Sequence, residues 1–156
     1  MQQFFIQNSE IILRLLVAVG LGLAIGAERL LVKEAAGMKT HALVSLGAAV
    51  FMIISEMMVQ KYMNLPGLNP TMMAAQVIVG IGFLGAGSII LHGSRLVGLT
   101  TAGGLWVTAG IGMAAGFGLY SLAVITTVLV LLVLTVVNLF EKPIRRISGD
   151  TENGIK

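Results

Sequence analysis

Cysteine is absent from the 156-residue sequence, and charged residues make up only 11% of it. Without cysteine, the chain can form no disulfide scaffold, no thiolate metal site and no thiol nucleophile. Soluble domains carry about 25% charged residues, so this chain has too few to cover a water-facing surface. Hydrophobic residues instead account for 56% of the sequence. The composition therefore predicts an integral membrane protein.

Motifs for nucleic-acid binding and for catalysis are also missing. Ten Lys and Arg against seven Asp and Glu give a net charge of +3, and the basic residues are scattered along the chain. The sequence has no HExxH, no P-loop and no Ser/His/Asp set with suggestive spacing. We therefore expect no nucleic-acid partner, no catalytic residue, no cofactor and no metal site.

Five apolar stretches have about the length that a helix needs to cross a bilayer. Uninterrupted runs such as TVLVLLVLTVV at 127–137 exclude a β-barrel, whose strands alternate polar and apolar residues. No positive charge precedes the first stretch, so we expect it to be retained rather than cleaved as a signal peptide. We predict an all-α, polytopic transmembrane bundle over residues 1–141 and a short polar cytoplasmic tail over 142–156. The predicted helices cover about 11–31, 40–58, 71–91, 100–115 and 119–140. Asn69–Pro70, a cap residue followed by proline, predicts the start of the third helix.

The distribution of Lys and Arg predicts the orientation, because cytoplasmic loops carry an excess of these residues. An outer N-terminus and a cytoplasmic C-terminus leave only Arg14 and Lys61 on the outer side. Arg14 can pair with Glu10 one helical turn away, and Lys61 is near enough to balance Glu56. The inner basic residues are then Arg29, Lys33, Lys39, Arg95, Lys142, Arg145, Arg146 and Lys156.

Twenty glycines, many of them inside the predicted helices, indicate close helix packing. The third stretch spells GxGxxG, but it lacks the preceding strand of a dinucleotide site, so we reject that interpretation. Its glycines favour a closely packed, bendable helix face, with a broken helix that lines a cavity as the alternative. The predicted helix-packing glycines are Gly22, Gly26, Gly80, Gly82, Gly85, Gly87, Gly112 and Gly116.

Polar residues gather at the predicted cytoplasmic ends of the helices, where charges beside a membrane span are costly. For Arg29 the alternative is simple anchoring at the interface, and for His41 it is a hydrogen-bonded packing role. Glu28 needs a basic partner, for which Arg29, Lys39 and Arg95 are candidates. We place Gln76 and Trp106 in the bundle interior. The predicted functional cluster consists of Glu28, Arg29, Lys39, Thr40, His41, Arg95, Thr100 and Thr101.

Three ordered blocks of the sequence resemble the MgtC/SapB family of membrane proteins, over about residues 15–132. The chain departs from the family pattern at Lys39, where arginine is usual, and at Asn69 and Met72, where aspartate and arginine are usual. These departures put in doubt any role that needs an ion pair at Asn69 and Met72. The blocks are GAER at 26–29 with AGMKTHALVSLGA at 36–48, AQVIVGIGFLGAG at 75–87, and GLTTA at 98–102 with LW at 105–106 and AGIG at 109–112.

The resemblance implies a bacterial inner-membrane protein that regulates adaptation to low magnesium and, in pathogens, survival inside host cells. It implies action through another membrane protein, with the F-type ATP synthase as the family-level partner; a homo-oligomer is a further option. A cation or small-solute carrier is the alternative, although Glu28 and Glu56 lie on opposite sides and form no evident path. Many members carry a cytoplasmic C-terminal domain, and this chain ends about sixteen residues after its last apolar stretch, so we expect a short member.

Overall fold

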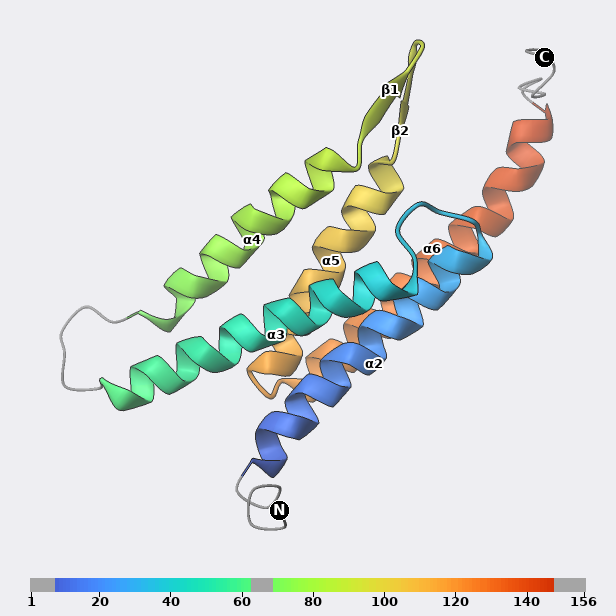
Figure 1. Ribbon diagram of the computed structural model, residues 1–156. Helices are drawn as coiled ribbons and strands as arrows, with labels where there is room; N and C mark the ends of the chain where they lie inside the picture. The colour runs from blue at the N-terminus through green and yellow to red at the C-terminus, as the bar shows by residue number, and fades with distance from the viewer. Residues whose placement is uncertain (1–7, 63–68, 148–156) are drawn as a thin grey trace.

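The computed structural model describes residues 8–62 and 69–147, which fold into five helices and one short hairpin (Figure 1). Successive helices run in opposite directions, so that the start of the first and the end of the last lie at opposite ends. The prediction of an all-α bundle of five helices is confirmed. The elements are α2 (Ser9–Leu31), α3 (Met38–Lys61), α4 (Pro70–Gly87), β1 (Ile90–His92), β2 (Arg95–Val97), α5 (Leu99–Gly116) and α6 (Tyr120–Ile147).

The surface of the bundle is apolar, as expected for a protein in lipid. Three helices are long and apolar enough to cross a membrane, namely α2, α3 and the part of α6 over Tyr120–Leu139. Helix α4 is apolar but shorter. Large hydrophobic side chains on α6, among them Leu129 and Leu139, are more than half exposed. Leucines on an outer face cost little when the solvent is hydrocarbon.

Helix α3 lies between α2 and α5, and small residues on both neighbours bring the three backbones close together. A Cβ added to Gly22 on α2 would lie 2.7 Å from the carbonyl oxygen of His41, and one added to Gly26 would collide with the backbone of Met38. On α5, a Cβ on Gly112 would collide with the backbone of Ser45. Gly116 likewise has no room for a Cβ. These four glycines allow α2 and α5 to pack closely against α3 at the centre of the bundle.

The glycines of α4 lie elsewhere, and the expectation that they form one packed face is wrong within this chain. Gly80, Gly82 and Gly87 have open space around the position of a Cβ, and only Gly85 makes an ordinary contact, with Ala102 at 3.5 Å. The reason is helical phase. In α4 only Ile81 and Gly85, one turn apart, are buried, so the other glycines point away from this stripe.

The third helix is also shorter than the predicted 71–91. It ends at Gly87, where the hydroxyl of Ser88 donates a hydrogen bond to the carbonyl of Gly85 at 2.7 Å. The next residues form an antiparallel hairpin of β1 and β2 in which His92 pairs with Arg95. Gly98, the N-cap residue of α5, has a φ of +94°, and a side chain there would collide with the carbonyl of Ser88. The hairpin projects beyond the helices at the end of the bundle where α6 also ends (Figure 1).

Helix ends follow local sequence signals in some places and not in others. The predicted cap of α4 is confirmed, since the Asn69 side chain accepts a hydrogen bond from the Thr71 amide at 3.0 Å and Pro70 follows it. Helix α3 begins at Met38, before Thr40, and its N-cap residue is Gly37. Helix α6 continues to Ile147, beyond the predicted end at 140. Most of the predicted tail, residues 148–156, lies outside the described residues.

Trp106 and Gln76 are on the outer surface of the chain, contrary to the prediction of an interior position. The Trp106 side chain is 55% exposed, and Gln76 is exposed on α4. Helix α5 packs through Thr101, Leu105 and Thr108, and the α-helical rotation of about 100° per residue turns Trp106 away from that face.

Candidate functional site

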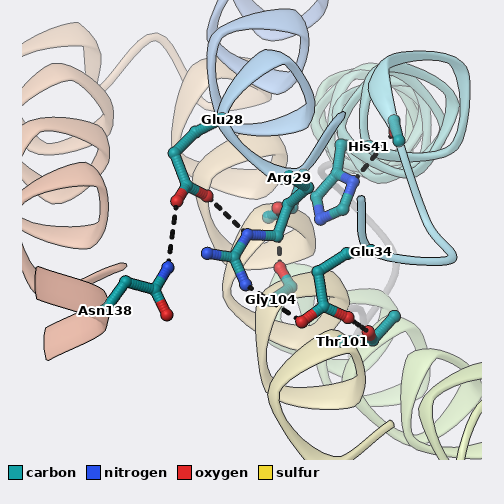
Figure 2. A network of polar contacts seen from close by, with 9 residues as sticks. Glu28, Arg29, Glu34, His41, Thr101, Gly104 and Asn138 are labelled. Atoms are coloured by element: carbon teal, nitrogen blue, oxygen red, sulfur yellow. Dashed lines mark hydrogen bonds and ion pairs between the residues drawn. The ribbon is translucent and has the colours of Figure 1, made fainter. Parts of the chain in front are cut away.

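Polar side chains from four helices and one connection, buried or partly buried, meet at the end of the bundle where α2 ends and α3 begins (Figure 2). We call this group the rim cluster. Arg29 lies at its centre, between carboxylates on both sides. Its six members are Glu28 and Arg29 on α2, Glu34 in the α2–α3 connection, His41 on α3, Thr101 on α5 and Asn138 on α6.

Arg29 is almost completely buried, with 1% of its side chain exposed. Its Nε donates to Glu28 at 2.5 Å, and its Nη1 lies 3.9 Å from the carboxylate of Glu34. An arginine that anchors a helix at the interface keeps its guanidinium in water, which Arg29 does not do. The burial therefore rules out simple interfacial anchoring. A buried charge needs such partners, because taking it out of water without them costs several kcal/mol.

Glu34 joins the α2–α3 connection to α5. Its Oε2 accepts a hydrogen bond from the buried hydroxyl of Thr101 at 2.8 Å, and its backbone amide donates to the carbonyl of Arg29 at 3.0 Å. The predicted functional cluster does not include Glu34, because this residue lies outside the apolar stretches. It lies only five residues after Arg29, where the chain reverses direction, and this short separation indicates that its carboxylate can reach the arginine.

Asn138 brings α6 into the cluster, since its Nδ2 lies 3.4 Å from Oε1 of Glu28. The predicted functional cluster does not include Asn138 either. It is a lone amide in the apolar run VLTVVNLF, and a polar group at that depth is itself a signal that a partner lies nearby. Glu28 is thus held by Arg29 on its own helix and by Asn138 on another.

His41 is fully buried on α3, facing α5. Its Nδ1 lies 3.0 Å from the carbonyl oxygen of Gly37, and a carbonyl only accepts hydrogen bonds, so Nδ1 carries the proton. In the neutral ring the lone pair is then on Nε2, on the side of Gly104, where a Cβ would lie 3.4 Å away. Nε2 of His41 and Nη2 of Arg29 are buried and make no hydrogen bond to any described residue.

The structure brings together four of the eight residues predicted for the functional cluster and separates the others. Glu28, Arg29, His41 and Thr101 meet in the rim cluster. The remaining four are exposed. For the three on helices the reason is that nearby positions on a helix point in different directions. Lys39 and Thr40 line a groove between α3 and α4, Thr100 lines a groove between α5 and α6, and Arg95 lies in the hairpin.

A second polar cluster lies at the opposite end of the bundle, around Arg14. The guanidinium pairs with Glu10 at 2.5 Å, as predicted, and with Glu56 on α3, and it donates to the carbonyl of Gly116 at 3.0 Å. Glu56 therefore pairs with Arg14 and not with Lys61. The two clusters are fourteen residues apart on α2, about 21 Å, which is less than the roughly 30 Å of a bilayer's hydrocarbon core. In each cluster the guanidinium is paired with two carboxylates.

The segment that contains the rim cluster matches a known family. The profile of the MgtC family matches residues 15–143, which include all six members of the cluster. The chain belongs to the MgtC family. No solved structure matches it.

Relatives of this MgtC-family chain come from several bacteria. YhiD of Escherichia coli K12, described as a candidate magnesium transporter, is 45% identical over 83% of the chain and 61% of its own length. The protein MgtC of Salmonella typhimurium LT2 is 45% identical over 77% of the chain and 49% of its own length. An uncharacterised protein of Haemophilus influenzae is 41% identical over 86% of the chain and 58% of its own. The chain thus spans about half to three fifths of these relatives.

The chemistry available to the rim cluster of this MgtC-family chain is that of hydrogen bonding and charge pairing. It contains two carboxylates and one guanidinium, with a hydroxyl, an amide and an imidazole around them. Among residues 8–62 and 69–147, no three His, Cys, Asp or Glu side chains are grouped so that they could hold a metal ion. The cluster joins α5 to the α2–α3 connection and α6 to the end of α2.

Proposed function

We propose that the chain is a multi-pass protein of the bacterial inner membrane that regulates adaptation to low magnesium by binding another membrane protein, without catalysing a reaction. Membership of the MgtC family and the magnesium-related description of YhiD support the link to magnesium. We further propose an outer N-terminus and a cytoplasmic C-terminus, which places the rim cluster on the cytoplasmic side.

The observation that supports binding is a set of glycines on the outer surface of α4 and α5. Gly80, Gly82 and Gly87 on α4 and Gly103 and Gly110 on α5 have open space where a side chain would be. Helices associate in lipid through close backbone contact, and glycine permits this contact. Within residues 8–62 and 69–147 no atom packs against these positions, so they are suited to a helix of another protein. The family-level partner is the F-type ATP synthase.

The state of the charged residues favours a binding role over transport. Arg29 and its two carboxylates are paired with one another, and Arg14 is paired in the same way at the other end. Ion paths in membrane proteins use polar groups that face a water-filled cavity. Here these groups fix the helices to one another.

Co-purification from bacterial membranes tests the proposal. The tagged chain, expressed at low magnesium and extracted in mild detergent, should retain subunits of the F-type ATP synthase. Gly82→Leu on α4 should lower the retained amount at least tenfold by blocking helix approach. Gly20→Leu is the matched control, because Gly20 on α2 also has open space around it. Equal retention by both variants, or none by the wild type, would contradict the proposed mode of binding.

Cation transport is the alternative, supported by the description of YhiD and by the two carboxylates beside Arg29. Purified chain in liposomes that contain a magnesium-sensitive dye should give no more flux than empty liposomes. A flux of Mg²⁺ that disappears in Glu28→Gln would show that the chain is a carrier and would contradict the proposed regulatory function.

A further inference from the structure

A groove lies between α3 and α4. The two helices diverge toward the end where α3 begins and α4 ends (Figure 1). The volume of the groove is about 380 Å³. Lys39 and Thr40 line one end, and the remaining wall is apolar and includes Gly47 on α3 and Ile81 on α4. The part of α3 that lines the groove, from Lys39 to Ala48, is about 13 Å long. The groove therefore has a basic, hydroxyl-bearing end and a long apolar body.

The shape and lining of the groove indicate what kind of molecule suits it. The groove follows about 13 Å of α3 and is apolar over most of that length. An extended acyl chain suits a long apolar groove of this kind. The groove opens to the lipid-facing side, since Leu43 is 67% and Leu84 54% exposed on its two walls.

The charge at the end of the groove points to an anionic headgroup. Lys39 is exposed and pairs with no carboxylate in the part of the chain that the structure describes. The sequence has no Asp or Glu between Glu56 and Glu141, so α4, the hairpin and α5 bring no negative charge to this region. Basic pockets between membrane helices bind anionic lipid headgroups.

We propose that this groove binds one anionic phospholipid. The phosphate lies at the ammonium of Lys39 and the hydroxyl of Thr40, and one acyl chain extends along Gly47 and Ile81. The first-turn amides of α3 add to the positive end, because the N-cap residue Gly37 provides no side-chain cap. The lipid fills the space between α3 and α4 and holds α4 against the bundle. This inference does not depend on the proposed regulatory role or on the orientation of the chain.

A second groove provides an internal control. It lies between α5 and α6, has a volume of about 360 Å³, and is lined by apolar residues with Thr100 and Thr126 but no charged side chain. Gly103 lines it, as Gly47 lines the first groove, and a Cβ at either glycine meets open space. A Cβ at either position therefore meets no obstacle, and we expect a leucine at either position to fill its own groove.

Native mass spectrometry of the full chain tests the proposal. The chain is released from nanodiscs that contain equal amounts of phosphatidylglycerol and phosphatidylcholine. We expect one phosphatidylglycerol per chain. Lys39→Gln should reduce its retention about fivefold, the effect of one basic residue near anionic lipid, and Gly47→Leu should abolish it. The controls Lys33→Gln and Gly103→Leu should retain lipid as the wild type does, and circular dichroism checks the helix content of each variant.

Three outcomes would overturn the proposal. Retention of phosphatidylcholine equal to that of phosphatidylglycerol would show that the basic end selects no anion. Full retention by Gly47→Leu would place the lipid outside the groove. The wild type could instead have the mass of two chains without lipid, and Gly47→Leu the mass of one chain. That result would show that a second copy of the chain occupies the groove.

Discussion

The buried guanidinium of Arg29, between Glu28 and Glu34, shows at the scale of single residues how this protein handles charge in an apolar bundle. Removing one partner of a buried pair leaves a charge without compensation, which costs about 3–5 kcal/mol. An exposed pair contributes about 0–1 kcal/mol, because water screens it and replaces the lost partner. Glu28 of the rim cluster, with 13% of its side chain exposed, belongs to a pair of the first kind, and Glu10, with 70% exposed, belongs to a pair of the second kind.

Glu28→Ala should therefore destabilise the bundle by about 3 kcal/mol, since it leaves Arg29 with only the more distant Glu34. The measurement is reversible unfolding in mixed micelles of SDS and mild detergent, followed by circular dichroism. Glu10→Ala is the control, because the Glu10 side chain is 70% exposed and its loss should cost less than about 1 kcal/mol. Equal effects of the two substitutions would mean that the rim cluster has no structural role.

Packing at the scale of helices depends on which glycine faces a neighbour. Gly112 on α5 lies against the backbone of Ser45, whereas Gly110, two residues earlier on the same helix, meets open space. Both have the same helix propensity, so any difference between them reports on the contact between α3 and α5. The pair gives a direct comparison within one helix.

Gly112→Ala should destabilise the chain by about 1–3 kcal/mol, because a methyl group forces α5 away from α3. Gly110→Ala should be neutral or stabilise it by up to about 1 kcal/mol, since alanine is the better helix former. The same unfolding assay measures both variants. If both stabilise the protein, the backbones of α3 and α5 are not in close contact.

At the scale of the whole molecule, the helices alternate in direction and place the hairpin and the rim cluster at one end and the Arg14 cluster at the other (Figure 1). The proposed orientation makes the first of these ends cytoplasmic. Because the sequence contains no cysteine, a single introduced thiol can be labelled without background.

A membrane-impermeant maleimide should leave Ser94→Cys, at the hairpin turn, unlabelled in intact spheroplasts and label it after lysis. Gln60→Cys, near the end of α3 on the other side, should be labelled in both. The reverse pattern would invert the orientation and move the rim cluster to the outside.

The sequence by itself determined the features that depend on local physics. The apolar composition and the lengths of the runs predicted a membrane bundle of five helices, and the Asn69–Pro70 signal predicted the start of α4. The Arg14–Glu10 pair followed from the spacing of one helical turn. Each of these needs only residues that are close together in the chain.

Only the tertiary structure decided which faces are buried. It placed Glu34 and Asn138 in the rim cluster, left Lys39 outside it, and put Trp106 on the surface. In water the polar face of a helix marks its outer side, but in lipid both faces are apolar, and the sequence pattern loses this information. The partner of each side chain is then set by how helices distant in sequence are rotated against one another.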